Sequence, residues 1–547
     1  MTPVKFIFGN SKKRLPEIIF LCLIGSVSSV CYILLALFSK NLLDSVTNGD
    51  SRSVPVFSLY IFSVIIFQVL LYSIKNRLTA TVSGRLDIAY KSAVFSSLTK
   101  KRFEDITAYH SGEVLNRLTS DIEIIVNLVS VSLPTAVSLI TKIIAGITML
   151  FIMNVKFGLI ITVAGLSVMI CGRIVGPRYK AMHKDCQKTQ GAVRSFLQEC
   201  IQNIVVLKTF SGENSVNLHL DAKLNENYKM KLRRNLLNIV IVSGLYLVFS
   251  VGYYGTLLWG AYGVAQKTLS IGSLIAFLQI ISQIRSPLYN VSGIIPQYYS
   301  AVSSAERILE ITCLKDEPKN PNFDAQKFYN SLISIDVNSL SFSYKDGKNV
   351  IKNANIKINK GDIVAVTGES GAGKSTFIKL LLGLYSPTDG SITLHTKNGD
   401  YAMSSEFRKL FSYVPQGNFV LSGTIKDNIT FGNNNPDKAE FLSACKTATV
   451  DEFVKDLPDG YDTVLGERGT GLSEGQIQRI AIARALLSKS PVILLDECTS
   501  ALDEKTEQKL LENLKLEKNK TVLLISHKPA AQKICNASVS IVNNILQ

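Results

Sequence analysis

Six long runs of apolar residues dominate the first half of the chain and set its expected architecture. Each run is long enough for a membrane-crossing helix, which needs about 20 apolar residues to span a bilayer. The runs lie near residues 17–39, 54–74, 130–153, 157–177, 236–263 and 268–290. The last run is interrupted by Arg285 and Pro287. The pattern predicts an all-α polytopic membrane domain with six transmembrane helices.

The connections between these runs alternate in length and in charge. Those after the first, third and fifth runs are short and carry few Lys or Arg residues, whereas residues 75–129 and 178–235 are long and basic. Because basic loops tend to stay on the cytoplasmic side, we expect the long connections and both termini to be cytoplasmic. Their helical spacing with few breakers predicts helices that continue beyond the bilayer.

The pattern changes after about residue 333, where short apolar strands alternate with helices. Stretches such as DIVAVTG, PVILLDE and TVLLISH indicate buried strands. Alternating strands and helices are typical of an α/β domain with a largely parallel sheet. A polar segment rich in Pro and Asn precedes the change and indicates a linker. We therefore expect a membrane domain over 1–315, a linker over 316–332 and an α/β domain over 333–547.

The composition fits a membrane part joined to a soluble part. The 547 residues are 47% hydrophobic and 19% charged, with a mean hydropathy of +0.22. Residues 1–330 hold 34 Lys+Arg and 19 Asp+Glu, so most of the net charge of +16 lies there. This excess does not form a basic domain interleaved with aromatic residues, which argues against nucleic-acid binding.

Two further features exclude other classes of protein. The nine cysteines are scattered without a CxxC pair, so neither a zinc site nor a disulfide framework is expected. The N-terminus is basic and then apolar, but no small-residue cleavage site follows. We therefore expect a first membrane helix there rather than a cleaved signal peptide.

The strongest chemical signal is the stretch GESGAGKST, which follows the strand DIVAVT and precedes the helical pattern FIKLLLGLY. This is the context that a P-loop requires, because glycines let backbone N–H groups close around phosphates at a helix N-terminus. Lys374 is expected to reach the β- and γ-phosphates of ATP, and Ser375 to hold Mg²⁺. The expected ATP contacts are Gly368, Glu369, Ser370, Gly371, Ala372, Gly373, Lys374, Ser375 and Thr376.

An apolar strand that ends in two carboxylates supplies the second half of this expected site. PVILLDE ends in Asp496 and Glu497, about 120 residues after the P-loop. Asp496 is placed to bind the shell of Mg²⁺ through water, and Glu497 to polarise an attacking water. The pair of motifs predicts an ATPase that uses Mg²⁺.

The remaining motifs resemble those of the ATP-binding cassette (ABC) ATPases. GLSEGQ (471–476) lies about 20 residues before PVILLDE and resembles the signature loop of that family. SFSY resembles its aromatic loop, SYVPQ its Q-loop and SALD its D-loop, and LLISH ends in a residue that resembles its switch histidine. The resemblance implies that Tyr344 stacks on adenine, that Gln416 lies near Mg²⁺ and the attacking water, and that His527 contacts the γ-phosphate.

The membrane part extends the resemblance to nearly the whole chain. GEVLNRLTSDI (112–122), ECIQNIVVLKTFSGEN (199–214) and SSAERILEI (303–311) resemble segments of ABC exporters. Spans fused before the cassette, with two long cytoplasmic connections, also resemble exporters rather than importers. The resemblance implies ATP hydrolysis coupled to export by alternating access, with Glu497 as base and with Gln416 and His527 assisting.

In this family the signature loop of one cassette completes the ATP site of another, so the resemblance implies a dimer. The residues expected to act in trans are Leu472, Ser473, Glu474, Gly475, Gln476 and Asp503. Because Glu497 and His527 leave each composite site complete, a homodimer is expected. Glu474 departs from the commoner Leu-Ser-Gly-Gly-Gln: either its side chain points away from the phosphates, or it repels the γ-phosphate and slows the site. Cys498 is interpreted as a packing residue rather than a redox group.

Two basic residues within the apolar runs are candidates for contact with the cargo. Lys142 lies about 12 residues from the outer end of the third run, and Arg285 lies in the sixth. Intramembrane charges are functional hypotheses by default. We expect a cavity of cationic character, with Gln279 and Gln283 in its lining, that favours a carboxylate or phosphate on a peptide or lipid. The alternative is that both side chains reach the interface or the polar backbone by snorkelling.

The sequence leaves several functions and the cargo open. Peptide, drug-like and lipid exporters share this plan. A lipid flippase, one subunit of a heterodimeric exporter, or an ATP-gated channel or sensor would also fit the motifs. The moderate length of the chain favours a bacterial plasma membrane as its location. The expected partners are a second copy of the chain, the bilayer and the exported molecule, without nucleic acid.

Overall fold

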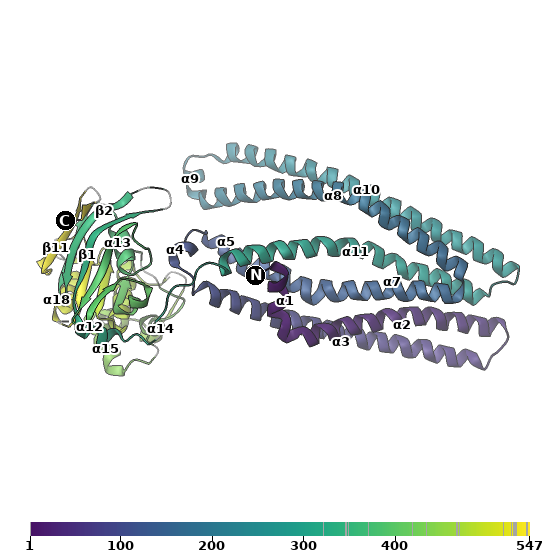
Figure 1. The fold of residues 1–547 in the computed structure, drawn as a ribbon, viewed down its shortest axis with the longest axis horizontal. Coiled ribbons are helices and arrows are strands. Elements are labelled where there is room, and N and C mark those ends of the chain that lie inside the picture. Colours follow the sequence, from purple (N-terminus) through teal and green to yellow (C-terminus); the bar gives the residue numbers. More distant parts are fainter. Residues whose placement is uncertain are drawn as a thin grey trace. The chain divides into compact units, whose positions relative to one another are not determined.

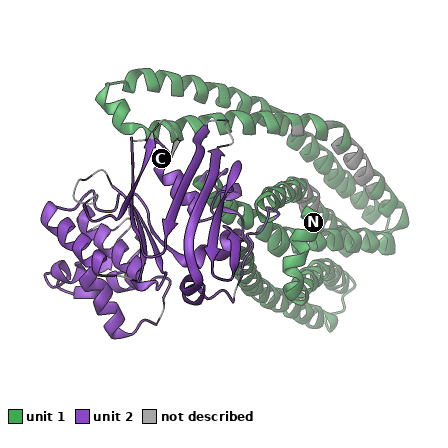
Figure 2. Cartoon of the chain, turned by 60° about the vertical axis from the view of Figure 1, so that its left-hand side comes forward, with its two compact units in different colours: residues 1–96, 111–312 green, residues 97–110, 313–547 purple. Residues whose placement is uncertain are grey.

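The structure is a computed structural model, and it divides the chain into two units. One unit comprises residues 1–96 and 111–312, and the other comprises residues 97–110 and 313–547 (Figure 2). The structure describes all residues except 1, 321, 345, 346, 348, 370, 418, 419, 434, 467, 468, 470, 518, 527, 529–532, 543, 544 and 547. Within helices and strands, the side chains of 161, 164–172, 175, 180, 183, 286–292, 542, 545 and 546 also lie outside the described part.

The first unit is built of helices, most of them long (Figure 1). Its α-helices are α1 Pro3–Ser11, α2 Leu15–Thr47, α3 Ser53–Leu98, α5 Ser111–Asn116, α6 Ile122–Asn127, α7 Leu133–Met153, α8 Val155–Gln202, α9 Ile204–Thr209, α10 Glu213–Ala265 and α11 Ile271–Thr312. A 3₁₀ turn, η1 (Lys12–Arg14), joins α1 to α2. Two π-helical turns, η2 (Arg117–Asp121) and η3 (Leu128–Ser132), join α5, α6 and α7.

Four helical segments in the described part are long and apolar enough to cross a membrane. They are Pro3–Thr47, Ser53–Leu98, Ser111–Met153 and Glu213–Ala265, and Ile271–Arg285 is a shorter apolar helix. These segments contain the predicted runs at 17–39, 54–74, 130–153 and 236–263. The predicted run at 157–177 lies within α8, and most of the run at 268–290 lies within α11; part of each falls on side chains outside the described residues. The long basic connections are largely helical, as expected, because α3, α8 and α10 extend well beyond their apolar runs.

Helices α2 and α7 approach closely through small and hydroxylated side chains. A Cβ atom at Gly25 would lie 1.9 Å from the hydroxyl oxygen of Ser138, so only glycine fits there without a shift of that side chain. Ser29 donates a hydrogen bond of 2.9 Å to the carbonyl of Ser138, and Ser26 and Thr141 share one of 3.0 Å. Small residues and interhelical hydrogen bonds are the usual means of packing helices in lipid.

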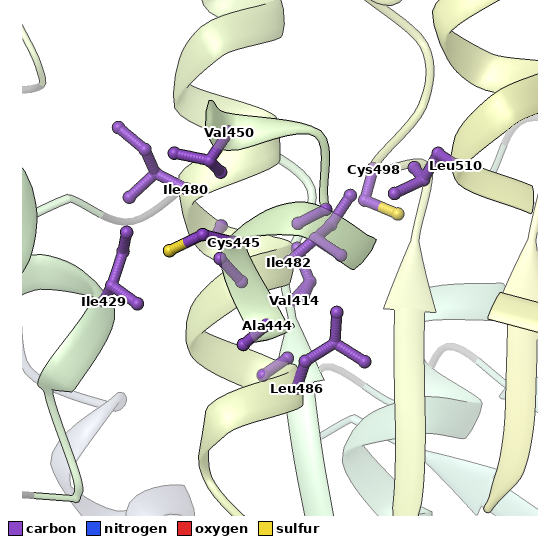
Figure 3. Packing of buried hydrophobic residues seen from close by; sticks show 14 of the residues in the cluster. Val414, Ile429, Ala444, Cys445, Val450, Ile480, Ile482, Leu486, Cys498 and Leu510 are labelled. Atoms are coloured by element: carbon purple, nitrogen blue, oxygen red, sulfur yellow. The ribbon is translucent and has the colours of Figure 1, made fainter. Parts of the chain in front are cut away.

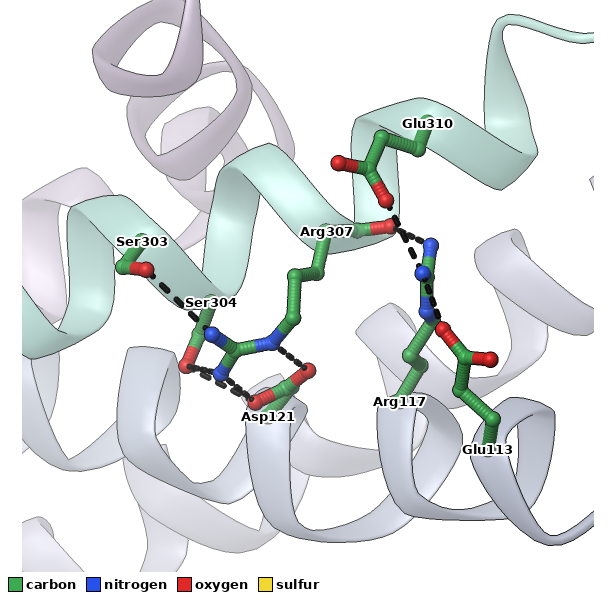
Figure 4. A network of polar contacts seen from close by, with 7 residues as sticks. All are labelled: Glu113, Arg117, Asp121, Ser303, Ser304, Arg307 and Glu310. Carbon is green, nitrogen blue, oxygen red and sulfur yellow. Dashed lines mark hydrogen bonds and ion pairs between the residues drawn. The ribbon is translucent and has the colours of Figure 1, made fainter. Parts of the chain in front are cut away.

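A network of charged side chains joins the π-helical turn η2 to α11 (Figure 4). Arg307 donates to both carboxylate oxygens of Asp121, in one bond at 2.9 Å, and Ser304 donates to the same group at 2.9 Å. Arg117 forms an ion pair of 2.9 Å with Glu310 and also donates to the carbonyl of Arg307. Arg117 and Asp121 are buried, so this network fixes η2 against α11.

The second unit combines two main sheets with short helices. Its strands are β1 Leu332–Ser343, β2 Asn349–Asn359, β3 Ile363–Gly368, β4 Asp389–Thr396, β5 Gly399–Ala402, β6 Phe411–Val414, β7 Gly423–Thr424, β8 Val464–Leu465, β9 Val492–Asp496, β10 Thr521–Ile525, β11 Ala537–Val542 and β12 Ile545–Leu546. Its helices are α4 Phe103–Ile106, α12 Ala325–Ser331, α13 Lys374–Leu381, η4 Ser405–Leu410, α14 Ile425–Thr430, α15 Lys438–Thr447, α16 Val450–Val454, η5 Gly460–Asp462, α17 Glu474–Leu487 and α18 Glu504–Leu516.

The larger sheet has the order β12-β11-β3-β10-β9-β6, and its five strands from β11 to β6 are parallel. A smaller antiparallel sheet has the order β2-β1-β4-β5. Strand β9 is buried at every position: Ile493 and Leu495 pack in one apolar cluster, whereas Val492 and Leu494 pack in another. Both faces of the sheet are thus covered, which explains why its strands read as continuous apolar runs. The predicted fold class, an all-α membrane domain followed by an α/β domain, is confirmed.

Residues 97–110 follow a membrane helix in sequence but pack with the second unit. The expected boundaries place them in the membrane domain. Lys101 is buried and forms an ion pair of 2.7 Å with Asp316. The ring of Phe103, at the start of α4, meets the ring of Tyr385 edge to face at 5.7 Å. The tip of the first long connection therefore belongs to the same compact unit as the α/β sheets.

Candidate functional site: an ATP-binding edge of the parallel sheet

The P-loop connects β3 to α13 at the carboxyl edge of the parallel sheet. Gly371 and Gly373 have φ values of +83° and +99°, which side-chain-bearing residues rarely adopt. A Cβ at Gly373 would also lie 2.8 Å from the Val350 side chain. Lys374 begins α13 and donates to the carbonyls of Gly368 and Glu369 at 2.7 and 2.9 Å, so its ammonium lies over the loop. Ser370 lies outside the described residues.

Asp496 ends β9 at the same edge of the sheet and is buried. Its Oδ1 is buried without a hydrogen-bond partner among the described residues, while Tyr413 donates to Oδ2 at 3.3 Å. Burial raises the pKa of Asp496, and hydrogen bonding from Ser375 and Tyr413 lowers it. Asp496 Oδ1 and the Ser375 hydroxyl are both hard oxygen donors, the type of ligand that Mg²⁺ prefers. The predicted metal residues Ser375 and Asp496 are therefore together.

Glu497, the predicted base, is held in an unusual backbone conformation. Its φ is +49°, in the left-handed region, and its N–H donates to the carbonyl of Ile525 on β10 at 3.0 Å. Its carboxylate accepts a hydrogen bond of 2.7 Å from the side-chain amide of Gln416. Strained backbone of this kind concentrates at functional sites, because the surrounding structure has to enforce it. The predicted pair of base and Q-loop residue is thus in direct contact.

Tyr344, the predicted adenine platform, sits in a cluster of aromatic rings. Its ring lies 5.0 Å from Phe342 and 5.5 Å from Tyr385, both nearly edge to face. Its hydroxyl shares a hydrogen bond of 2.9 Å with Thr376 on α13. These contacts fix the ring beside the first turn of the helix that follows the P-loop.

The signature loop ends at the N-terminus of α17. The Ser473 hydroxyl accepts from the N–H of Gln476 at 3.3 Å, and the Gln476 side chain accepts from the N–H of Ser473 at 2.9 Å. This reciprocal capping box fixes the first turn of the helix. Glu474 is exposed there, and a carboxylate in a first turn is favourable for the helix dipole. Leu472 is half-buried and packs against the apolar core.

The D-loop packs directly on this signature helix. A Cβ at Gly475 would lie 2.8 Å from the carbonyl oxygen of Ala501. The buried Gln478 of α17 donates to the hydroxyl of Ser500 at 3.1 Å and accepts from the N–H of Ala501 at 3.2 Å. Asp503 caps α18 by accepting from the N–H of Thr506 at 3.0 Å. The predicted switch residue His527 lies outside the described residues.

Three side chains at this edge escaped the motif analysis: Tyr413, Gln478 and Lys528. Tyr413 lies three residues before Gln416, and Gln478 two residues after Gln476. Each sits inside or beside a recognised motif, but its role depends on a contact with a segment distant in sequence. The strand alternation of SYVPQ could have indicated an inward-facing Tyr413. No sequence signal shows that Lys528 reaches the D-loop.

Cys498, next to the predicted base, is a packing residue. Its side chain is 1% exposed and lies in the apolar cluster with Val414, Ile482 and Leu510 (Figure 3). Burial raises the pKa of its thiol to about 12. A buried thiol that stays protonated is a poor nucleophile and a poor redox group, which supports the packing interpretation.

The predicted cavity residues lie on α7 and α11 in the first unit. Lys142 Nζ lies 4.6 Å from the ring centre of Tyr32, and Arg285 Cζ lies 4.9 Å from that of Tyr246. Gln279 and Gln283 are four residues apart on α11 and therefore share a face. Arg285 is two residues beyond Gln283, so it points to a different face of that helix. The four predicted residues thus do not form one stripe.

Comparison with known proteins identifies the family. The family description "ABC transporter transmembrane region" matches residues 18–288, and "ABC transporter" matches residues 351–500. A "Putative export ATP-binding/permease protein" of Rickettsia felis is 31% identical over 519 residues, which cover 92% of this chain and 88% of that protein. "ABC transporter B family member 1" of Dictyostelium discoideum is 31% identical over 458 residues, which cover 82% of this chain and 50% of that protein. The chain thus spans about half the length of the latter relative.

A solved structure shows the same fold. A bacterial Atm1-family ABC exporter with ATP bound superimposes with a TM-score of 0.80 and 22% identity, covering 98% of this chain and 94% of that chain. The chain therefore belongs to the ABC transporter family and has the exporter arrangement, with the membrane region N-terminal to one ATP-binding cassette. It is a multi-pass membrane protein that binds ATP and couples its hydrolysis to transport.

Proposed function

We propose that two copies of this chain form an exporter of the cytoplasmic membrane, with two composite ATP sites at the interface of the cassettes. The observation that carries the proposal is the convergence of Lys374, Asp496, Gln416 and Glu497 at one sheet edge. Gln416 and Glu497 are in direct contact, and one oxygen of Asp496 has no hydrogen-bond partner among the residues that the structure describes. In one chain, these groups would bind the phosphates and the metal ion and orient the attacking water. The exposed, capped N-terminus of α17 would contact the ATP that a second chain binds.

The signature loop supports action in trans. Ser473 and Glu474 are exposed, and N–H groups in the first turn of a helix lack the carbonyl acceptors that later turns have. Backbone N–H groups at a helix N-terminus favour a phosphate. In the proposed dimer, Ser473 and the N–H groups near Gly475 meet the γ-phosphate that the partner's P-loop holds. Leu472, Gln476 and Asp503 line the same contact.

The hairpin tip of α8, α9 and α10 supports a dimer independently. Several large apolar side chains are exposed at this tip, on a hairpin whose neighbouring residues are polar. They are Ile201, Ile204, Val205, Val206 and Phe210. Exposed apolar groups in such a cluster mark contact with another protein. The occupant that we propose is the cassette of the second copy, which would receive the tip on cassette closure.

Each chemical step is assigned to residues of this chain. Ser375 and Gln416, with Asp496 acting through water, would hold Mg²⁺, which would supply positive charge next to the phosphate oxygens. Lys374 binds the β- and γ-phosphates. Glu497, oriented by Gln416, accepts a proton from the attacking water, and His527 is the proposed contact to the γ-phosphate. ATP binding closes the cassettes, the cytoplasmic helices carry this closure to the membrane helices, and hydrolysis resets the cavity.

The proposed cargo carries a carboxylate or a phosphate. Lys142 and Arg285 each lie on a tyrosine ring, and a cation–π contact stabilises a cation away from water while leaving its charge available to an anion. Gln279 and Gln283 offer amide groups on another face of α11. A peptide with a free C-terminus and a lipid with an anionic head group both satisfy this chemistry.

ATPase activity of the purified chain in lipid nanodiscs tests the function. We expect Mg²⁺-dependent turnover that Glu497→Gln lowers by about 10²-fold or more, and stimulation by one class of cargo. Folded chain that binds ATP without turnover would favour a heterodimer with a missing subunit. Turnover without accumulation of any substrate would favour a channel or sensor, and substrate that only changes leaflet would favour a flippase. Unchanged transport of an anionic cargo by Lys142→Ala and Arg285→Ala would contradict the cationic cavity.

A further inference from the structure

Lys528 reaches from the end of β10 to the D-loop and contacts three acceptors there. Its ammonium donates to the carbonyls of Thr499 and Leu502 at 2.9 and 3.0 Å and forms an ion pair of 3.1 Å with Glu507 on α18. A lysine ammonium has three donors, so all three are used. The Glu507 carboxylate is buried, whereas the side chain of Lys528 is partly exposed.

The two carbonyls that Lys528 binds bracket the exposed part of the D-loop. Thr499 and Leu502 are buried, whereas Ser500 and Ala501 between them are exposed. From the other side, Gln478 of α17 holds the same two exposed residues through a hydroxyl and an N–H. The D-loop is therefore fixed between two side chains, one from the signature helix and one from the segment that follows β10.

The end of β10 adjoins the residues that we assign to the chain's own ATP site. Strand β10 pairs in parallel with β3, which leads into the P-loop, and with β9, which ends in Asp496. The carbonyl of Ile525 at the end of β10 accepts from the N–H of Glu497. Lys528 lies three residues after Ile525 in the chain, so it is close in sequence to this edge of the sheet.

We propose that Lys528 is a positioning residue that ties the D-loop to the chain's own ATP site and so couples the two composite sites of the dimer. ATP-dependent movement at the end of β10 shifts Lys528, and Lys528 carries Thr499 and Leu502 with it. Ser500 and Ala501, which lie between these two residues, then change their positions relative to the partner cassette. The coupling rests on the proposed dimer, whereas the positioning of the D-loop by Lys528 does not.

A purely structural role is the main competing explanation, because Lys528 also neutralises a buried carboxylate. Removing one partner of a buried ion pair destabilises a protein by leaving the other charge unpaired. The double variant Lys528→Met/Glu507→Gln removes that unpaired charge but does not restore the two contacts to the D-loop carbonyls. Glu507→Gln alone keeps those contacts. Lys528→Arg retains a cation that can donate to both carbonyls.

The experiment uses the full chain in nanodiscs with two readouts. The first, hydrogen–deuterium exchange of the peptide containing Thr499 to Asp503, needs no turnover. The second is the Hill coefficient of ATP hydrolysis, with the affinity for a fluorescent ATP analogue measured alongside. Lys528→Met and the double variant are expected to exchange about tenfold faster at the D-loop and to hydrolyse ATP with a Hill coefficient near 1, with ATP affinity within about twofold. Glu507→Gln and Lys528→Arg are expected to resemble the wild type, with a Hill coefficient above 1.

Unchanged D-loop exchange in the double variant would overturn the positioning role. Faster exchange with an unchanged Hill coefficient would overturn the coupling, as would a wild-type chain that hydrolyses ATP with a Hill coefficient of 1. Either result leaves the exporter proposal intact. A wild-type chain without any hydrolysis would instead contradict the proposed homodimer and the coupling that depends on it, and the exchange readout would still decide the positioning role.

Discussion

The side-chain amide of Gln416 donates a hydrogen bond of 2.7 Å to the carboxylate of Glu497. The two residues are 81 positions apart in sequence, but they follow β6 and β9, which are neighbours in the parallel sheet. The φ of +49° at Glu497 turns the residue off the end of its strand. Sheet pairing brings the two loops together, and the left-handed backbone aims the carboxylate. The fold itself thus sets the orientation of Glu497, the proposed base.

We expect Gln416→Ala to lower kcat with little change in KM. A hydrogen bond to a charged group is worth about 1.5–3 kcal/mol, so loss of orientation at Glu497 should reduce kcat about 10- to 100-fold. Steady-state ATPase kinetics in nanodiscs measure the effect, with Glu497→Gln as the reference for complete loss of the base. A tenfold rise in KM at unchanged kcat would show that Gln416 serves ATP binding instead.

Tyr413→Phe should increase the requirement for Mg²⁺, most strongly at low pH. Burial raises the pKa of Asp496 and the Tyr413 hydrogen bond lowers it, so removal of the hydroxyl raises this pKa further. A raised carboxyl pKa means that the proton competes with Mg²⁺ at a higher pH, and this competition fades as the pH rises above the pKa. The Mg²⁺ concentration for half-maximal ATPase should therefore rise more steeply between pH 8 and pH 6 in the variant.

A matched control separates the contact with Asp496 from the general effect of losing a tyrosine hydroxyl. Tyr461→Phe removes another partly buried hydroxyl of the same unit, whose contact is Cys445 rather than Asp496. It should leave the Mg²⁺ requirement unchanged at both pH values. Binding of Mn²⁺ with ADP, followed by electron paramagnetic resonance, gives a second readout that does not depend on turnover. Equal Mn²⁺ affinity in Tyr413→Phe and wild type would contradict the role of Tyr413.

Asp121→Asn should destabilise the membrane unit strongly. Asp121 is buried and accepts from Arg307 and Ser304, and each hydrogen bond to a charged group is worth about 1.5–3 kcal/mol. Glu113→Gln is the control, because Glu113 is exposed and the buried Arg117 keeps its ion pair with Glu310 in that variant. Thermal unfolding in detergent measures both variants, and equal midpoints for the two would contradict the structural importance of this network.

The contiguous motifs made much of the ATP edge predictable from sequence. The residues on either side of GESGAGKST already indicate a strand before it and a helix after it. The structure places Lys374 and Ser375 at the junction of the loop with that helix. Asp496 follows a fully apolar strand, so its position at the sheet edge needed no long-range information. The packing of Cys498 followed equally well from its place among apolar neighbours.

Contacts between distant segments were not predictable in the same way. Lys528 donates to backbone carbonyls more than 25 residues away. Every residue has a backbone carbonyl, so the sequence does not indicate which one a lysine will contact. Which faces of the membrane helices line a cavity was not predictable either, because it depends on how the helices pack against one another. The placement of residues 97–110 with the cassette depends on buried contacts such as Lys101 with Asp316, which local composition does not reveal.

Glu474→Gln distinguishes the two interpretations of the unusual signature residue. Glu474 is exposed in the first turn of α17, so we expect its side chain to remain in solvent and the ATPase rate to change less than about twofold. If the carboxylate instead faced the γ-phosphate, neutralisation would raise the rate severalfold, most of all at low ionic strength where charges are least screened. ATPase assays at two salt concentrations therefore separate side-chain repulsion from an inert surface charge.

Gly475→Ala should uncouple ATP binding from hydrolysis. The added Cβ would lie 2.8 Å from the carbonyl oxygen of Ala501, a backbone atom that cannot rotate away, so the D-loop or the first turn of α17 has to move. Neither segment contributes to ATP binding within the same chain, so affinity for the nucleotide should stay within about twofold while hydrolysis falls about tenfold or more. Gly471→Ala is a useful comparison, because no atom lies within 4 Å of its added Cβ, although its φ of +109° strains any side chain. Strain at Gly471 leaves the D-loop in place, so faster hydrogen exchange at Ser500 and Ala501 is expected in Gly475→Ala alone, and equal exchange in both variants would show that the contact with Ala501 does not position the D-loop.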